Sequence, residues 1–561
     1  MKNQNNLLMF AFVLFALRLM VADRAGASVV ERFSQSAESH RGASIVVEKF
    51  SGDISILGTD ENILSVTVDL EVKNGSEGLA QEFIDNSSLT IIKSSDRYRI
   101  VFDTPMLSDD STVPEAFVRN FKTLFKGGAW QISSSQKMEI HVPEEQNVSI
   151  HNAYGNLTME NAYGDHSLHN SSGVIHIKEC GGRLDAKNSY ALVDIRDFDG
   201  PIDVHSSSGK VNVRDIYGKT LISNSYRNVT FRNIHGDCMI QSSSAEVEGE
   251  FVDGDCDVKT SYKKIDVAHV KGDLTVNGSS SSVTAKYVNG RVSIESSYNP
   301  VIVDSVGGTL SIKSGSAQVT ATRIGNDADI RTSYNPIKIE DVKGSLNVEG
   351  SSCAVDANYI KGNVYITATY NDIAAKNIDG YLEVYGSSAS VTASNVSESV
   401  TIQSTYNPIS ATSIGGDLFI DGSSCSVRAD DIGGDIDISN TYKYVVLSGT
   451  RGSVRVHGSS SPIELDIDEL PAGKNIEMIT TYKQIKLLLP PNVNAMLDAT
   501  ADEIEIEHIE TLGNGHFDAD DIELKNTRSK AVAKDRFKAT MGSGQSSIVL
   551  KTDKKIVVGN N

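Results

Sequence analysis

Tryptophan, cysteine and proline are all scarce in this chain of 561 residues. Trp130 is the only tryptophan, and the chain has five cysteines and 11 prolines. An odd number of cysteines is not the disulfide framework of a small secreted domain. The residues that recur along the whole length are Ser, Thr, Val, Ile and Gly, which favour strands joined by turns. We therefore expect a β-rich protein.

Positive charge is in deficit as well. The chain has 52 Lys and Arg against 73 Asp and Glu, a formal net charge of −21. Nucleic acids and anionic lipids require clustered Lys and Arg, so the composition disfavours both as partners. A surplus of negative charge keeps a long protein soluble and separate from its copies. We interpret the charge as solubilising, and we expect a monomer.

Only one long apolar run is present, from Leu7 to Leu17, and it follows the positive charge of Lys2. The small residues Ala25-Gly26-Ala27 then suit a signal peptidase, so residues 1–27 are predicted to be a signal peptide cleaved after Ala27. The run is shorter than the roughly 20 residues that cross a bilayer. Arg18 close behind it leaves an uncleaved anchor as the alternative. We expect an exported protein, periplasmic, at the cell surface or extracellular, with no transmembrane segment after cleavage.

An 18-residue repeat covers residues 147–452 in seventeen consecutive units without an insertion or deletion. Arg291 to Gly308 is one such unit, RVSIESSYNPVIVDSVGG. Repeat positions two, four, eleven, thirteen and sixteen are apolar, and the pairs spaced by two residues mark two short strands with one buried face. Position eighteen is Gly in fifteen of the seventeen units, which indicates a turn residue with positive φ. Each unit therefore reads as strand, turn, strand, turn: one coil.

A single coil cannot bury its apolar face, but a stack of coils can. The fold class that we predict is all-β, a single-stranded parallel β-helix (β-solenoid). Coils about 4.8 Å apart would make a rod roughly 80 Å long. A right-handed coil is preferred, because the aliphatic residues do not fall six apart as in the left-handed hexapeptide helix. A calcium-binding β-roll is disfavoured, since Ile414-Gly-Gly-Asp417 carries only a fragment of its motif.

Position eight adds a 36-residue superperiod. It alternates between Tyr and Ser in every unit: Tyr154, Ser172, Tyr190, Ser208, Tyr226, Ser244, Tyr262, Ser280, Tyr298, Ser316, Tyr334, Ser352, Tyr370, Ser388, Tyr406, Ser424 and Tyr442. Position eight shares parity with the buried positions two and four, so we expect each ring to pack over the Ser of the next coil. The alternative is an exposed tyrosine stripe that stacks on sugar rings.

The flanks are less regular. Residues 28–146 are predicted to form the first coils and a cap with a short helix at 114–125, where Phe117, Phe121, Leu124 and Phe125 share one helical face. That helix would cover the open end of the solenoid, or alternatively dock a partner or a membrane. Residues 453–561 are predicted to form irregular coils and a second cap, with insertions at Leu470 and Leu489.

Chemistry-bearing residues are few. Cys238 and Cys256 share position two on adjacent coils, where they form either a disulfide or two buried thiols. His151 and His169 share position five on neighbouring coils, and His205 lies two coils further on. We interpret them as surface histidines, because no Cys or carboxylate is fixed beside them to complete a metal site. The sequence assigns no catalytic, cofactor-binding or metal-binding residue and no ligand-binding site.

Unbroken coils leave no obvious place for a catalytic cleft, which parallel β-helix enzymes build from long loops or a break in the repeat. We therefore predict a non-catalytic protein. The alternative is a carbohydrate-active parallel β-helix enzyme, a polysaccharide lyase or hydrolase.

Three segments carry a resemblance to a known family. They are Ala43-SIVVEKFSGDISIL-Gly58, then Met138-EIHV-Pro143 before the repeat, and the closing Gly542-SGQSSIVL-Lys551. In this order they resemble the bacterial putative-adhesin β-solenoid family, an exported domain of unknown function. The resemblance implies a secreted or envelope-associated solenoid and supplies no catalytic residues.

The function that we predict is adhesin-like binding or envelope scaffolding by a repetitive surface, with a cell-surface or envelope component, glycan or protein, as the partner. Contacts would recur at positions three, five and twelve, for example at Ser293, Glu295 and Ile302.

Overall fold

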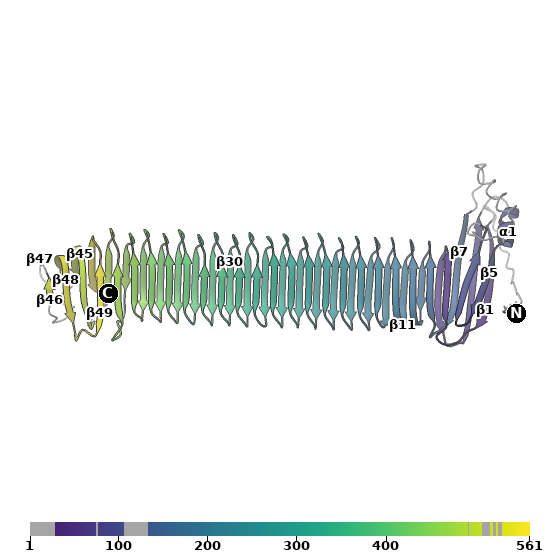
Figure 1. Cartoon of the computed structure of the whole chain (residues 1–561), viewed down its shortest axis with the longest axis horizontal. Helices are drawn as coiled ribbons and strands as arrows, with labels where there is room; N and C mark the ends of the chain where they lie inside the picture. The colour runs from purple at the N-terminus through teal and green to yellow at the C-terminus, as the bar shows by residue number, and fades with distance from the viewer. Residues whose placement is uncertain are drawn as a thin grey trace, which may run out of the picture. The chain divides into compact units, whose positions relative to one another are not determined.

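The computed structural model describes residues 28–73, 77–105, 133–491, 493–507, 517–519, 523–524 and 530–560. The predicted signal peptide and the predicted helix at 114–125 lie outside these residues. The chain divides into two compact units, 1–263 and 264–561, and each is described by itself. Figure 1 labels strands of both units and colours the chain by residue number. Among the described residues, no helix has the length and apolar character needed to span a bilayer.

The repeat of the first unit forms two parallel sheets. Val148 pairs with His166, which pairs with Leu184, so each strand lies beside the equivalent strand of the next coil. Sheet 1, from repeat positions two to six, contains β8 (Asn147–Asn152), β10 (Tyr163–Asn170), the second half of β11 (Ile175–Asn188), β13 (Ile202–Ser206), β15 (Thr220–Asn224), β17 (Cys238–Ser242) and β19 (Cys256–Thr260). Sheet 2, from positions eleven to sixteen, contains β9 (Leu157–Glu160), the first half of β11, β12 (Val193–Asp199), β14 (Val211–Ile216), β16 (Val229–Ile234) and β18 (Val247–Val252).

The second unit has two sheets of the same kind. Its sheet 1 contains β21 (Leu274–Gly278), β23 (Val292–Ser296), β25 (Leu310–Ser314), β27 (Ala328–Arg331), β29 (Leu346–Glu349), β31 (Val364–Thr367), β33 (Leu382–Tyr385), β35 (Val400–Ser404), β37 (Leu418–Gly422), β39 (Ile436–Asn440), β41 (Val454–Gly458) and β43 (Asn475–Ile479). Its sheet 2 contains β20 (Ile265–Val270), β22 (Val283–Val288), β24 (Val301–Val306), β26 (Val319–Ile324), β28 (Ile337–Val342), β30 (Val355–Ile360), β32 (Ile373–Ile378), β34 (Val391–Val396), β36 (Ile409–Ile414), β38 (Val427–Ile432), β40 (Val445–Thr450), β42 (Ile463–Asp466) and β44 (Ile485–Leu489). This pairing of equivalent residues in successive repeat units confirms the predicted β-solenoid.

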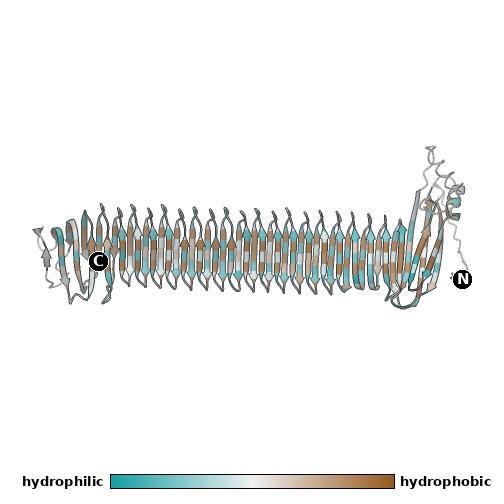
Figure 2. Ribbon diagram, in the orientation of Figure 1, coloured by the Kyte–Doolittle hydropathy of each residue, from teal (hydrophilic) through white to brown (hydrophobic). Residues whose placement is uncertain are grey.

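The core lies between the two sheets, and the five predicted apolar positions fill it. In Figure 2, hydrophobic and hydrophilic residues are interspersed along the strands. In the unit 291–308, the side chains at these positions are all 3% exposed or less: Val292, Ile294, Val301, Val303 and Val306. Stacking aligns them with their equivalents in the neighbouring coils, so each position becomes a continuous apolar column. The stack thus buries the apolar face that a single coil would leave exposed to solvent.

A left-handed residue at position fifteen explains why position sixteen is buried. In all seventeen repeat units the residue at position fifteen has φ between 53° and 61°, and in sixteen of them it is not glycine. It is skipped by the strand pairing, as between Lys178↔Arg196 and Cys180↔Phe198. One αL residue shifts the strict alternation of the strand by one, so positions thirteen and sixteen both face the core.

The expectation of positive φ at position eighteen was wrong for most repeat units. Of the glycines at this position, only Gly182 and Gly200 have positive φ. Close approach of the coils is the reason for glycine there. A Cβ on Gly218 would lie 2.4 Å from the carbonyl carbon of Gly200 in the preceding coil.

Two kinds of turn at positions six to nine produce the Tyr/Ser superperiod. Coils with Ser at position eight are called here serine coils, and coils with Tyr there are called tyrosine coils. In serine coils the residue at position nine points inward and is fully buried, as Ala317, Cys353 and Cys425 are. Position six is often Gly in these coils, because a Cβ on Gly350 would lie 2.1 Å from Cys353 Sγ. In most tyrosine coils position six is polar instead, and its buried side chain donates to the position-nine carbonyl of the preceding serine coil. These bonds are 2.7–3.1 Å long, from Asn188, Asn224, Thr260, Ser296, Thr332, Ser404 and Asn440.

Extra strands cover the N-terminal edge of the first unit. β2 (Ser44–Phe50) and β3 (Asp53–Thr59) form a coil paired with β8 and β9. β6 (Arg97–Asp103) and β7 (Ser133–Pro143) lie on that coil. Antiparallel β4 (Ile63–Lys73), β1 (Ser28–Glu38) and β5 (Ser88–Ser94) extend the layer. Helix α1 (Glu77–Asp85), which the sequence analysis missed, contacts β1 and β4.

The C-terminal edge of the second unit is covered in a related way. The register widens at Val454↔Ile476, where the pairing accommodates the insertion at Leu470. β49 (Ser546–Lys551) and β50 (Lys555–Asn560) then form the last coil on β43 and β44. β45 (Ala495–Glu507) runs along both of these strands, and it pairs antiparallel with β48 (Lys530–Met541). β46 (Phe517–Ala519) and β47 (Glu523–Leu524) pair with β48. Such covering strands occupy the open backbone edge that a solenoid end exposes.

The αL conformation at position fifteen predicts an unusual response to valine. Ser413 (φ 55°) occupies this position, so Ser413→Val is expected to lower the free energy of unfolding by about 1–2 kcal/mol. Ser413→Gly is expected to leave it unchanged or raise it by up to about 1 kcal/mol, because glycine has no αL penalty but a more flexible unfolded state. Urea denaturation measures both, with Ser410→Val, at an outward strand position, as the neutral control. Equal losses for the two valine variants would contradict the assignment.

The alternation of turns predicts that deletions of two coils are tolerated and deletions of one coil are not. Removing 327–362 joins a serine coil to the tyrosine coil 363–380, a junction that the native stack already contains. Removing 345–362 joins two tyrosine coils, deletes the inward Cys353 side chain and leaves a void, which we expect to lower stability by about 1–3 kcal/mol. Thermal denaturation compares the two deletions, and a larger loss from the 36-residue deletion would refute this account.

Candidate functional site

The tyrosines at position eight are exposed, which corrects the packing expected for them. In the first unit these are Tyr154, Tyr190, Tyr226 and Tyr262, and in the second Tyr298, Tyr334, Tyr370, Tyr406, Tyr442 and Tyr482. Each is 64–72% exposed. Position eight was predicted to face the core because it shares parity with positions two and four. This alternation does not reach it, because the strand of sheet 1 ends by position six and position eight lies in a turn. Tyr262, Tyr406 and Tyr442 have positive φ in this turn. Each unit therefore presents a column of rings, one on every second coil, called here the tyrosine column.

A groove in the first unit runs beside its tyrosine column. Its volume is about 1180 Å³, and positions five to seven of successive coils line it. The residues with basic side chains in its lining are Lys49, His151, His169, Lys187, His205 and Lys259. The remaining lining residues are mainly Ser and Asn, such as Ser171 and Asn188. None of the described residues that line it is an Asp or Glu. We call it the basic groove.

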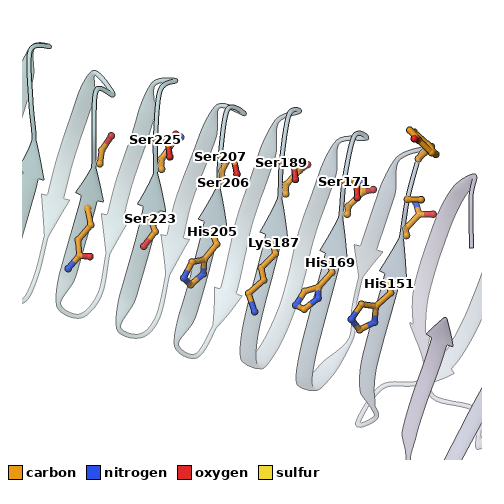
Figure 3. A pocket seen from close by; sticks show the side chains of 18 of the residues that line it. His151, His169, Ser171, Lys187, Ser189, His205, Ser206, Ser207, Ser223 and Ser225 are labelled. Carbon is orange, nitrogen blue, oxygen red and sulfur yellow. The ribbon is translucent and has the colours of Figure 1, made fainter. Parts of the chain in front are cut away.

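Successive parallel strands hold the basic side chains in a row. Figure 3 shows His151, His169, Lys187 and His205 on neighbouring strands of sheet 1, with the serines of position seven beside them. The rings of His151 and His169 meet edge to face, with centroids 4.6 Å apart. The structure thus brings together the two histidines that the sequence placed on adjacent coils, and it adds Lys187 between them and His205.

Carboxylates at position three lie beside part of this row, contrary to the expectation from the sequence. Asp185 accepts from Lys187 Nζ at 2.9 Å and lies 3.8 Å from His169 Nε2, and Asp203 lies 3.2 Å from His205 Nδ1. Burial lowers the pKa of His169, and the positive charges of His151 and Lys187 lower it further, against the opposing effect of Asp185. His169 is therefore held toward its neutral form until an additional negative charge approaches.

Several buried polar atoms beneath the groove have no hydrogen-bond partner within the described part of the chain. They include the Oδ1 atoms of Asn152, Asn170 and Asn188, at position six of three consecutive coils, and Nε2 of His169. The amide nitrogens of the same asparagines donate to backbone carbonyls. Because the asparagine oxygens are enclosed in the stack, the polar groups that the groove itself offers beside its row of cations are the serine hydroxyls of position seven, as at Ser171, Ser189 and Ser207.

Other candidates from the sequence contribute less. Among the described residues, no group of three or more His, Cys, Asp or Glu is arranged to hold a metal ion. Cys238 and Cys256 are paired in register, and both are free buried thiols in the structure. Burial is the main cause of the raised pKa of Cys238, and the hydrogen bond with Cys256 raises this pKa further. Such protonated thiols pack as small apolar groups.

A second recess, of about 870 Å³, lies in the second unit at positions fourteen to seventeen. Both basic side chains of its described lining are paired with carboxylates, Lys361 with Asp379 at 2.7 Å and Arg451 with Asp431 at 2.8 Å. Of the contact residues expected for the solenoid surface, Glu295 is exposed and Ile302 is 42% exposed, whereas Ser293 is half-buried. These residues form no cluster comparable to the basic groove.

Comparisons with known proteins give structural likenesses only. No protein-family model and no curated protein matches the chain. Solved structures similar to it include a putative cell adhesion protein from Clostridium sporogenes, at 9% identity over 46% of this chain and 99% of that one, with a TM-score of 0.18. Another is a putative adhesin from Bacteroides fragilis, at 11% identity over 58% of this chain and 97% of that one, with a TM-score of 0.14. A third is a putative lipid binding protein from Parabacteroides distasonis, at 10% identity over 70% and 96%, with a TM-score of 0.14.

The solved structures that resemble this chain thus include putative adhesins of bacterial origin, as the sequence resemblance predicted. At these identities and TM-scores they assign neither ligand nor activity. The function has to be argued from the surface of the chain itself.

A histidine of the core predicts a pH dependence of stability. His166 occupies position two, where the neighbouring coils have Val148 and Leu184, and it is 3% exposed. Burial lowers its pKa below the ordinary value of 6.5. The unfolded chain then binds the proton first, so stability is lost as the pH falls below about 6.5 toward the folded-state pKa.

We expect His166→Leu to remove this loss, since leucine suits the site and Gly181 N–H still donates to the Ala162 carbonyl that His166 contacts. Melting temperatures at pH 7.5 and 5.5 test it, with His205→Gln as the exposed control. A gain from His166→Leu that is the same at both pH values would show that the histidine is not the source.

Proposed function

We propose that the chain is a non-catalytic, exported, adhesin-like protein that binds a polymeric component of a cell surface or envelope through its tyrosine columns. The observation that carries the proposal is the exposure of all ten position-eight tyrosines, 64–72% each, at the same point of every second coil. Large rings exposed to this extent add little to the core. Export is supported by the apolar run at Leu7 to Leu17.

Tyrosine suits repeated recognition of sugars. Its ring has an apolar face that can cover the C–H face of a pyranose, and its hydroxyl can hydrogen-bond to the ligand or to water. It has few rotatable bonds, so fixing it on a ligand costs little conformational entropy. Two coils span about 9.6 Å, which is of the order of an extended disaccharide. A linear glycan could therefore place equivalent rings over successive tyrosines of one column.

Weak contacts that repeat in this way add by effective concentration. A polymer that has bound one ring meets the next ring of the column at high local concentration, so avidity rises without any strong single contact. The affinity would then be distributed along each unit and would decrease gradually as coils are removed.

A binding role is favoured over catalysis by how the polar groups are placed. Hydrolysis or elimination requires an acid, a base or a metal to converge on one bond. In the basic groove the side chains follow one another at one per coil, and none of the described lining residues is a carboxylate. The competing function, a carbohydrate-active β-helix enzyme, would reveal itself by a fall in the length of a polysaccharide incubated with the protein.

The tyrosine columns predict a specific loss of binding. The triple variant Tyr298→Ala, Tyr334→Ala, Tyr370→Ala should keep its melting temperature and lose at least about tenfold in avidity, or about 1.4 kcal/mol. Binding is measured on glycan arrays and then on a surface coated with the best polymer. The matched control replaces exposed tyrosines outside the columns, Tyr217, Tyr287 and Tyr359, and should change avidity less than about twofold.

Two outcomes would contradict the proposal. One is an equal effect of the two triple variants. The other is complete loss of binding on deletion of 327–362 with the fold intact, because that deletion removes only Tyr334 from the column and should reduce avidity modestly.

A further inference from the structure

We infer that the basic groove of the first unit binds an extended acidic polysaccharide, whose carboxylate or sulfate groups lie along the position-five row and whose hydroxyl groups lie along the serines of position seven. This site is separate from the tyrosine columns of the second unit and does not depend on their role. It goes beyond general adhesion because it assigns a chemical class of ligand to one segment of the solenoid.

The first argument is the sign of the charges. Acidic residues outnumber basic ones in the whole chain by 73 to 52, yet the described lining of the groove contains six Lys or His and no Asp or Glu. In the second unit, position five of the repeat has both negative and positive side chains: Glu295, Lys313, Arg331, Glu349 and Asp421. There Lys313 faces Glu295 at 3.9 Å, and Arg331 faces Glu349 at 3.5 Å. A run of one sign is therefore a property of the first unit and not of the repeat.

Like charges also face each other within this row. Like charges directly opposite each other on neighbouring strands are destabilising. His151, His169 and Lys187 are such neighbours, because their strands pair in register. Burial is the main cause of the lowered pKa of His169, and the positive charges of His151 and Lys187 lower it further. Asp185 offsets part of this repulsion, and a negatively charged ligand in the groove would offset more of it.

A row of hydroxyl groups lies beside the cations. Ser171, Ser189 and Ser207, at position seven of successive coils, line the groove and are at least partly exposed. A serine hydroxyl both donates and accepts hydrogen bonds, as sugar hydroxyls do. Hydroxyl groups recur along a polysaccharide, and anionic groups recur on acidic polysaccharides. A single ligand of this class can therefore contact both rows.

A single-stranded nucleic acid is also a linear polyanion, but it fits the groove less well. Sequence-independent binding of single strands relies on aromatic side chains on which successive bases stack. Of Phe, Tyr and Trp, the described lining contains Phe50 and Tyr154, and both lie at its N-terminal end. The rings of the neighbouring tyrosine column occur only on every second coil. The observations thus favour the polysaccharide, and the nucleic acid becomes an outcome of the test.

Binding should strengthen as the pH falls. Histidine is the side chain whose charge ordinarily changes in the physiological pH range, and the row contains His151, His169 and His205. The charged groups that face or flank them are Asp185, Asp203, Lys49 and Lys187. Asp185 and Asp203 are already paired with Lys187 and His205, so added protons increase the net positive charge of the row.

The experiment measures binding of the full chain to immobilised polygalacturonate, dextran sulfate and neutral dextran at pH 7.5 and 5.5, in low and high salt. We expect binding to one or both polyanions, tighter at pH 5.5 and weakened by salt, and none to dextran. Preference between polygalacturonate and dextran sulfate distinguishes carboxylate from sulfate. An oligodeoxythymidylate of matched charge that binds more tightly than both would overturn the inference.

The groove variant combines His151→Gln, His169→Gln, Lys187→Gln and His205→Gln. It should lower affinity at pH 5.5 by about tenfold or more and remove most of the pH dependence, since several exposed ionic contacts each contribute a small factor. The control combines Lys313→Gln, Arg331→Gln and His457→Gln, at the same repeat position in the second unit, and should change affinity less than about twofold.

If the quadruple variant fails to fold, the double variant Lys187→Gln, Lys259→Gln, at two exposed side chains, replaces it and should still weaken binding severalfold. The absence of polyanion binding, or equal losses in the groove and control variants, would overturn the inference. Loss of binding in the triple variant at Tyr298, Tyr334 and Tyr370 with the groove intact would instead concern the tyrosine columns. Shortening of polygalacturonate by the protein would overturn the non-catalytic function while leaving the groove as the place of binding.

Discussion

Backbone hydrogen bonding between each coil and the equivalent residues of the next coil is the constraint on which the rest of the structure depends. The bonds are formed at the same residues in every unit of the repeat, as Val292↔Leu310 and Leu310↔Ala328 illustrate. A single inserted residue would move every later side chain of that strand to the opposite face. The period is therefore kept without insertion through residues 147–452, and it widens only near Leu470, where the structure approaches its last coils.

Stacking in register turns each choice of residue into a column. Apolar columns stabilise the fold, because aliphatic side chains meet aliphatic side chains of the coils on either side. Many polar side chains inside the stack donate to backbone carbonyls, as Thr332 does to the carbonyl of Ala317 at 3.1 Å. Charged columns outside it are unfavourable when their signs agree. Alternating signs, as at Glu295 and Lys313, are the arrangement that stability alone favours, and the basic groove departs from it.

The sequence was sufficient for the fold, because strand parity and stacking follow directly from the period. Positions two, four, eleven, thirteen and sixteen were all correctly predicted as core. Parity failed where the backbone leaves the strand. Tyr298 lies in a turn and faces solvent, and Ser413 in the αL conformation shifts the alternation by one residue. His166 and the unpartnered asparagines could not be recognised as buried from their residue types, which usually indicate surface. Helix α1 is one short element in a strand-rich segment without repeat periodicity, and its buried face, which includes Ala80, Phe83 and Ile84, is too short to stand out from the neighbouring strands.

Folding and recognition use different repeat positions in this chain. The core columns lie at two, four, eleven, thirteen and sixteen, whereas the tyrosine columns lie at eight and the basic row at five. A substitution at position five or eight leaves the inter-coil hydrogen bonds in place, so the surface can change without loss of the stack. The first unit therefore presents a run of like charge, which the second unit does not, on the same backbone. The outward side chains differ between coils while the backbone stays the same. Specificity for a ligand would therefore depend on the side chains of particular coils, whereas avidity would depend on the number of equivalent coils.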